Sequence, residues 1–186
     1  MAEQSVITAD YIRSILSYDP EAGEFHWTTR TQAMFSAIPE RSAEHMCANW
    51  NSRFAAKIAS CQFGKGYLGV VVNGRRYAAH RLAWLYMTGN WPVADIDHID
   101  RDRANNKFAN LREATRSQNL ANTPHKANNL CGIKGVSFDG RRNRYRARIR
   151  VDGNECFLGY FDSLECAAAA YAKATKELHG EFAIAS

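Results

Sequence analysis

Apolar and polar side chains alternate across residues 143–151, where arginines and apolar residues occupy opposite positions of a two-residue repeat. In a strand, this period sends the arginines to one face and the apolar side chains to the other. Further strands are expected over 133–138 and 155–160, with Asp139-Gly140 and Asp152-Gly153 at the turns between the three segments. The pattern predicts a small three-stranded antiparallel sheet.

A helix is expected directly after this sheet. Asp162, with Glu165 three residues later, is typical of a capping box at a helix start, and Gly180 is typical of a helix end. The residues between them are rich in alanine, which allows a helix to lie close against a sheet. The C-terminal part of the chain is therefore expected to be a three-stranded sheet packed on one helix.

The first two thirds of the chain predict a mixture of short elements. Residues 67–72 are rich in β-formers and meet Asn73-Gly74, a strong signal for a hairpin. Residues 80–87 are apolar and compatible with a helix that stops at Gly89, whereas residues 31–60 show no clear period. The other expected elements are a helix within 7–18 capped by Thr8 or Asp10, a strand over 24–28, and a short helix over 113–122. Together these elements predict the α+β fold class.

The composition is that of a globular protein without a membrane span. The chain has 186 residues, of which 46% are hydrophobic and 23% charged, and no apolar run reaches the ~20 residues of a membrane helix. The N-terminus lacks the basic-then-apolar pattern of an export signal, so we expect a cytoplasmic protein. The five cysteines include no C-x-x-C pair and are expected to be free thiols.

Positive charge is concentrated in one segment. Residues 101–150 hold 13 Lys and Arg against 3 Asp and Glu, a balance of +10 in a chain whose net charge is +5. The rest of the chain is therefore acidic. Such an asymmetry is typical of a protein with a polyanionic partner.

A second cluster of interest is polar and includes one histidine. Asp97 and His98 are adjacent, Asn110 follows 12 residues after His98, and Asn119 follows nine residues later. Hydrolysis of a phosphodiester requires a base near neutral pH, which suits histidine. A carboxylate and an amide oxygen are hard ligands for a divalent cation that neutralises charge on the phosphate. This set of side chains indicates metal-assisted phosphodiester hydrolysis.

Residues 5–125 resemble the HNH endonucleases of phages and mobile introns. The resemblance is carried by Tyr77, His80-Arg81-Leu82, Asp97-His98-Ile99-Asp100, Asn105-Asn106, Asn110-Leu111-Arg112, Thr115 and Asn119. It implies a ββα-metal core within about 64–125. By position in the motif, Asp97 and Asn119 would be the metal ligands, His98 the general base, and Asn110 the residue that braces the hairpin and orients His98.

The last position of the motif is an asparagine, as in the intron-homing branch of that family, which favours one Mg²⁺ or Mn²⁺ ion. Two alternatives concern nearby histidines. His125 is the next candidate for the second ligand if Asn119 is not one. His80 precedes an apolar run, and we interpret it as structural and bonded to backbone.

The arginines of the C-terminal sheet indicate a nucleic-acid surface. Like charges on one sheet face repel one another, and arginine binds phosphate and guanine through its bidentate fork. Residues 131–183 resemble the ethylene-response-factor (APETALA) type of DNA-binding domain, through Tyr145-Arg146-Ala147-Arg148-Ile149, Leu158-Gly159-Tyr160-Phe161-Asp162 and His179-Gly180-Glu181-Phe182. By position, the resemblance implies DNA contacts from Arg144, Arg146, Arg148 and Arg150. Arg112 and Arg116 are further candidate DNA-binding residues.

These observations lead to one hypothesis and one alternative. The hypothesis is a phage or mobile-element endonuclease that nicks double-stranded DNA as a monomer, with a nuclease region over 1–125, a linker over 126–130 and a DNA-binding domain over 131–186. The alternative is a sequence-specific transcription regulator whose nuclease core is inactive. The intact set of Asp97, His98, Asn110 and Asn119 favours the enzyme.

Overall fold

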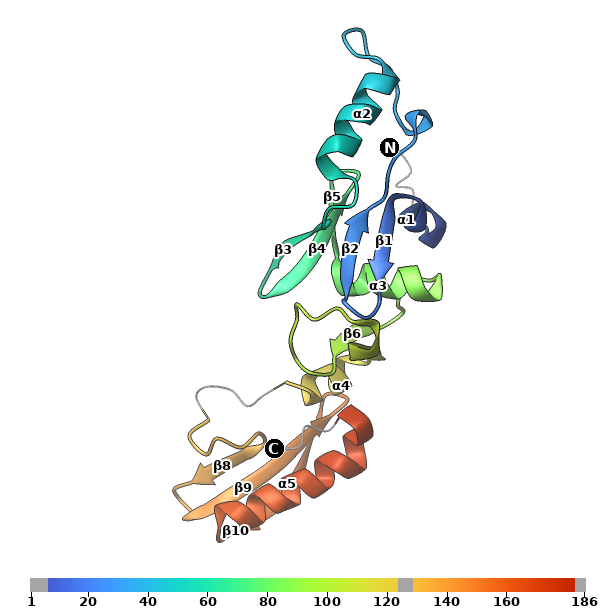
Figure 1. Ribbon diagram of the computed structural model, residues 1–186. Helices are drawn as coiled ribbons and strands as arrows, with labels where there is room; N and C mark the ends of the chain where they lie inside the picture. Colours follow the sequence, from blue (N-terminus) through green and yellow to red (C-terminus); the bar gives the residue numbers. More distant parts are fainter. Residues whose placement is uncertain (1–6, 124–128, 183–186) are drawn as a thin grey trace, which may run out of the picture. The chain divides into compact units, whose positions relative to one another are not determined.

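The computed structural model describes residues 7–123 and 129–182 (Figure 1). The chain forms two compact units, Met1–Arg112 and Glu113–Ser186. Each unit combines helices with antiparallel sheets, so the fold class is α+β, as predicted. Among the described residues, no helix has the length and apolar character needed to cross a membrane.

The first unit is built from short helices and three small sheets. The sheets are β1-β2, β3-β4-β5 and β6-β7, and β7 continues across the boundary between the units. The elements are α1 (Ala9–Ile15), β1 (Leu16–Asp19), β2 (Glu24–Trp27), η1 (Gln32–Met34), α2 (Ala43–Phe54), β3 (Ser60–Gly64), β4 (Tyr67–Val72), β5 (Arg75–Ala78), α3 (Ala79–Thr88), β6 (Asp95–His98), η2 (Phe108–Asn110) and β7 (Leu111–Ala114).

The start of the chain follows the prediction only in part. Thr8 caps α1 by accepting a hydrogen bond from the backbone of Tyr11, as expected for one of the two proposed caps. The helix ends at Ile15, however, because Leu16 has extended backbone angles and pairs with Trp27 in the β1-β2 hairpin. Leu16 is completely buried, so its apolar character reflects a strand position in the core.

The predicted hairpin and the helix after it are confirmed. Asn73 and Gly74 both have positive φ angles, 51° and 75°, and join β4 to β5. This conformation fits a tight hairpin loop and explains the preference for Asn-Gly. Helix α3 ends at Gly89, which adopts the left-handed conformation with φ of 82°. Its buried face, which includes Leu82 and Leu85, joins the core of the unit.

Residues 31–60 contain a helix that the sequence did not reveal. Helix α2 spans Ala43–Phe54 and is capped by Ser42. None of its residues is buried. An apolar period arises when one face of a helix packs against a core, so the exposure of α2 explains why no period was visible.

The second unit is a three-stranded antiparallel sheet covered by one long helix, as predicted. The strand order is β10-β9-β8. Ala147 and Ile149 on β9 are buried with Val136, Ala167 and Tyr171 in one apolar cluster. The elements are α4 (Arg116–Ala121), β8 (Val136–Asp139), β9 (Arg144–Val151), β10 (Asn154–Phe161), α5 (Leu164–His179) and η3 (Gly180–Phe182).

The cap of α5 differs from the sequence-based expectation. Ser163, and not Asp162, caps α5 by accepting a hydrogen bond from the backbone of Cys166, while Asp162 pairs with Arg144. In addition, the compact units divide after Arg112, upstream of the linker predicted over 126–130, of which 126–128 lie outside the described residues. Helix α4 belongs to the second unit because it contacts α5 and η3 there.

Candidate active site

Asp97 and His98 lie at the end of β6, and both are buried, with 4% and 5% of their surface exposed. Oδ2 of Asp97 accepts hydrogen bonds from Nη2 of Arg112 at 2.9 Å and from Nε at 3.0 Å. The Arg112 side chain is itself only 16% exposed. The structure therefore pairs Arg112 with the predicted metal ligand Asp97, whereas the sequence had suggested a DNA contact for it.

The imidazole of His98 is contacted by Asn106, which is 1% exposed. Nε2 of His98 lies 3.3 Å from Oδ1 of Asn106. The orientation of the Asn106 side-chain amide is fixed because its Nδ2 donates to the carbonyl of Ala104 at 3.0 Å. The backbone of Asn106 is held separately, since the hydroxyl of Tyr18 donates to its carbonyl at 2.6 Å. Since Oδ1 can only accept a hydrogen bond, this contact favours the tautomer with the proton on Nε2 and the basic lone pair on Nδ1.

Asn110 braces the loop that connects β6 to β7. Its Oδ1 accepts from the backbone of Asp100 at 3.0 Å, and its Nδ2 donates to Asp100 Oδ1 and to the carbonyl of Asn105, both at 2.9 Å. These bonds close the loop on which Asn106 lies. The sequence missed Asn106 as the direct partner of His98, although the paired asparagines at 105 and 106 were the available signal.

His80 and Tyr67 pack against the His98 ring. The ring centroids of His80 and His98 are 5.1 Å apart in an edge-to-face arrangement, and Tyr67 lies 5.9 Å from His98. Nδ1 of His80 is buried without a hydrogen-bond partner among the described residues. His80 is thus a packing neighbour of His98, in agreement with its interpretation as structural, and the expected bond to backbone is not made by Nδ1.

Burial lowers the pKa values of both histidines. For His80, burial, with the neighbouring His98 and Arg81, lowers the pKa to about 4. For His98, burial also lowers the pKa, against the opposing effects of the Asn106 hydrogen bond and of nearby carboxylates such as Asp100. Both rings are therefore neutral near pH 7, which is the form a general base requires.

Asn119 and Arg116 lie on α4 in the second unit. The helix begins with a capping box in which Thr115 and Gln118 bond reciprocally to each other's backbone. Asn119 is partly exposed. No group of three His, Cys, Asp or Glu side chains able to hold a metal occurs among the described residues, and His125 lies outside them.

The arginines of β9 project from the face opposite the buried Ala147 and Ile149, so the alternation is as predicted. Their charge is partly offset by carboxylates. Arg144 pairs with Asp162 at 2.8 Å, and Arg148 and Arg150 approach Glu155 at 3.0 and 3.8 Å. The repulsion among these like charges is therefore partly relieved, because acidic residues of β10 and of the position just after it reach the same face.

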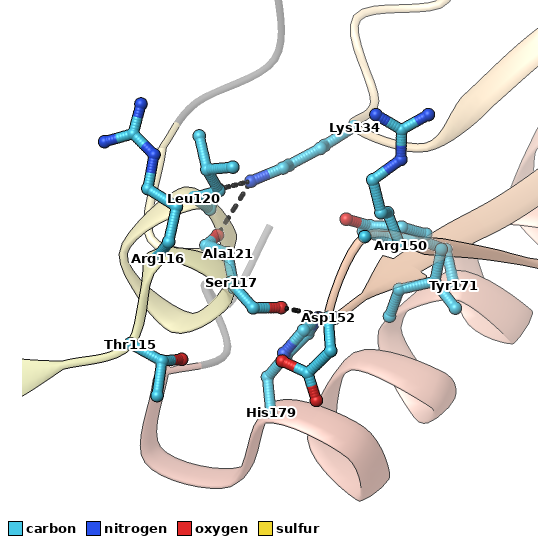
Figure 2. A pocket seen from close by; sticks show the side chains of 12 residues that line it. Thr115, Arg116, Ser117, Leu120, Ala121, Lys134, Arg150, Asp152, Tyr171 and His179 are labelled. Atoms are coloured by element: carbon cyan, nitrogen blue, oxygen red, sulfur yellow. Dashed lines mark hydrogen bonds between the residues drawn. The ribbon is translucent and has the colours of Figure 1, made fainter.

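One cavity of the second unit brings together two of the predicted DNA-binding residues. Arg116 from α4 and Arg150 from β9 both line a cavity of about 420 Å³ (Figure 2). The cavity walls also include Lys134 and His179. Arg116 and Arg150, far apart in the sequence, therefore line the same cavity of this unit, together with the acidic Asp152.

Comparison with known proteins adds three findings. Residues 77–121 match a protein family described as HNH endonuclease. The chain is 32% identical over 109 residues to "Protein 3.8" of Escherichia phage T7, covering 57% of this chain and 89% of the relative. It is 35% identical over 88 residues to "Uncharacterized HNH endonuclease L560" of Acanthamoeba polyphaga mimivirus, covering 47% of this chain and 44% of that protein.

No solved structure matches the chain. The family match ends at residue 121, before the three-stranded sheet. The resemblance of residues 131–183 to the ethylene-response-factor domain therefore remains a prediction.

Proposed function

We propose that this chain, a DNA-cleaving hydrolase whose residues 77–121 match the HNH endonuclease family, nicks double-stranded DNA with His98 as the general base and one divalent cation as cofactor. The observation that carries this proposal is the buried His98 ring, held by Asn106 at 3.3 Å beside the carboxylate of Asp97. An oriented, neutral imidazole next to a hard oxygen ligand is suited to hydrolysis of a phosphodiester.

The roles of the residues follow from their contacts. Nδ1 of His98 takes the proton of the attacking water, and Asn106 keeps the other ring nitrogen protonated. Asn110 holds the loop that carries Asn106 in place. Arg112 orients the carboxylate of Asp97 through two hydrogen bonds to the same oxygen. A single loop and two strands thus fix the proton acceptor and one ligand.

The donor set fits a hard cation. Asp97 offers a carboxylate oxygen and Asn119, by its position in the family motif, an amide oxygen. Magnesium and manganese bind such oxygen ligands and retain several waters, so two protein ligands are sufficient. When bound, the cation would neutralise negative charge that develops on the phosphate and the leaving oxygen.

The second unit is proposed to bind the DNA through the arginine face of β9, with Arg116 alongside Arg150. The exposed guanidinium groups are suited to phosphates and base edges. A surface that holds DNA is needed because the chemistry at a single phosphate carries no sequence information. We propose that the protein acts as a monomer, because one catalytic set cuts one strand per binding event.

The test is incubation of supercoiled plasmid with the protein and Mg²⁺ or Mn²⁺, and with a chelator. We expect relaxed circles only with the metal. Linear product without a relaxed intermediate would contradict nicking. Tight DNA binding without cleavage under any divalent cation would instead favour the alternative, a DNA-binding regulator with an inactive core.

A further inference from the structure

Helix α4 is attached to its own unit with little apolar packing. Ala121 is its only residue counted as buried, and Leu120 is 48% exposed. Beside the helix lies the cavity of about 420 Å³, lined on one side by α4 and on the other by residues of β9 and α5 (Figure 2). A helix this short is not stable alone, so other contacts must hold it.

Polar contacts contribute to holding the helix, and Lys134 makes several of them. Its ammonium donates to the carbonyls of Leu120, Ala121 at 2.8 Å and Thr123 at 2.7 Å. The last carbonyls of a helix have no partner within the helix and carry partial negative charge. One lysine thus donates to the last two carbonyls of α4, those of Leu120 and Ala121 (Figure 2), and to that of Thr123 just after the helix.

A second bond holds the other end of the helix. The backbone N–H of Asp152, in the turn between β9 and β10, donates to Oγ of Ser117 at 2.9 Å. The Lys134 side chain is half-buried, which lowers its pKa to about 8. Its burial is compatible with the three carbonyl acceptors, since a buried cation requires such partners.

We propose that Lys134 is a positioning residue, which fixes α4 and thereby the amide of Asn119 from outside the matched nuclease motif. This inference rests on the proposed function, because Asn119 is a metal ligand only there. The family match ends at residue 121, whereas the side chain that holds its last helix comes from the loop before β8. The C-terminal unit therefore supports the chemistry as well as holding DNA.

The experiment compares full-length wild type with Lys134→Met, which keeps the length of the side chain but removes its charge and donors. Lys173→Met, at an exposed position of α5, is the matched control. Mn²⁺ binding is measured by electron paramagnetic resonance in the presence of a short DNA duplex. We expect Lys134→Met to weaken Mn²⁺ binding by about 10- to 100-fold, the usual effect of losing a residue that supports a metal ligand.

Three further readouts separate positioning from general damage. Amide hydrogen exchange within α4 should become faster in Lys134→Met, and the far-ultraviolet circular dichroism should match wild type. DNA affinity in chelator should fall by less than Mn²⁺ affinity, because Arg116 is the only proposed DNA contact on α4. Lys134→Arg, which keeps the cation and its donors, should recover most of the Mn²⁺ affinity. Ser117→Ala, which removes only the smaller contact, should shift Mn²⁺ binding in the same direction by less.

Each contrary outcome has a defined meaning. Unchanged Mn²⁺ binding in Lys134→Met overturns the inference, and so does a loss of DNA affinity alone, which would make Lys134 a phosphate contact. If wild type shows no metal-dependent cleavage, the proposed function fails instead, while the exchange of α4 amides still reports whether Lys134 holds the helix.

Discussion

The two charged regions of this protein are built in opposite ways. Around His98, the polar side chains are buried and bonded to one another, as with Asp97, which is 4% exposed and paired with Arg112. On β9, the side chains of Arg144, Arg148 and Arg150 are between 42% and 67% exposed, and their carboxylate partners lie at the surface with them. Arg146 differs, because its Nε is buried without a hydrogen-bond partner among the described residues.

This difference sets the expected consequences of mutation. Removing the partner of a buried polar group lowers stability several times more than removing the partner of an exposed one, because water cannot replace the lost contact in the interior. The site around His98 should therefore respond strongly and locally to single changes. DNA binding through the arginines of β9 should be weakened only slightly by each single substitution and strongly by added salt.

The largest effect is expected where the arginine face meets the core. Ile149→Lys should unfold the second unit, because Ile149 is 3% exposed and an unpaired ion would be buried in the apolar cluster. Arg148→Ala, one residue earlier on the opposite face, should leave the fold intact. Thermal unfolding followed by circular dichroism tests both. A folded Ile149→Lys with an unfolded Arg148→Ala would reverse the assignment of the two faces.

The ion pair between Arg112 and Asp97 should matter for stability more than for DNA affinity. Arg112→Ala removes the guanidinium partner of a buried carboxylate and should lower the free energy of unfolding by about 3 kcal/mol. Arg76→Ala, at an exposed position, is the control. Urea unfolding and DNA binding at several salt concentrations are measured together. Unchanged stability, together with a reduced salt dependence of DNA binding, would indicate that Arg112 contacts DNA and not chiefly Asp97.

The His80 ring predicts a loss of stability at acidic pH. Its pKa is near 6.5 when unfolded and about 4 when folded, so only the unfolded chain takes up the proton between these values. Stability should be full above pH 6.5 and fall as the pH decreases toward 4, by on the order of 3 kcal/mol. His80→Phe, which keeps a ring but cannot titrate, should lose less over the same range in urea unfolding. Equal losses in both proteins would contradict this role of His80.

The catalytic prediction concerns His98 alone. His98→Ala should lower the rate of plasmid nicking by ~10²-fold or more, equivalent to about 2.7 kcal/mol in the barrier. DNA affinity should change little, because His98 is only 5% exposed and its proposed role is to take a proton from water. His45→Ala on the exposed helix α2 serves as the control. Nicking at the wild-type rate by a folded His98→Ala would remove His98 from the mechanism.

The smallest effects are expected on the arginine face. Arg146→Ala should weaken DNA binding by about 1 kcal/mol and reduce the salt slope of log affinity by roughly one unit if it contacts a phosphate. Glu155→Gln should instead strengthen binding, because Glu155 neutralises Arg148 and Arg150. Fluorescence anisotropy at several salt concentrations measures both. No change on Glu155→Gln would indicate that its ion pairs do not compete with DNA.

The sequence was most informative where structure depends on neighbours along the chain. The alternation on β9, the Asn73-Gly74 hairpin and the Gly89 helix end were all predicted, because each follows from backbone geometry or from the burial of one face. The Asp162 cap was wrong by one residue, since neighbouring polar side chains offer similar caps and packing selects between them.

The contacts of the candidate site could not be predicted from the sequence in this way. The sequence determined which chemical groups this protein has: a histidine beside a carboxylate, amides nearby, and a row of arginines on one strand face. Only the tertiary structure decided that Asn106 contacts His98, that Arg112 pairs with Asp97, and that Lys134 holds the end of α4. These partners meet through irregular loops, where no repeating period relates position in the sequence to position in space, so their pairing depends on how the whole chain packs.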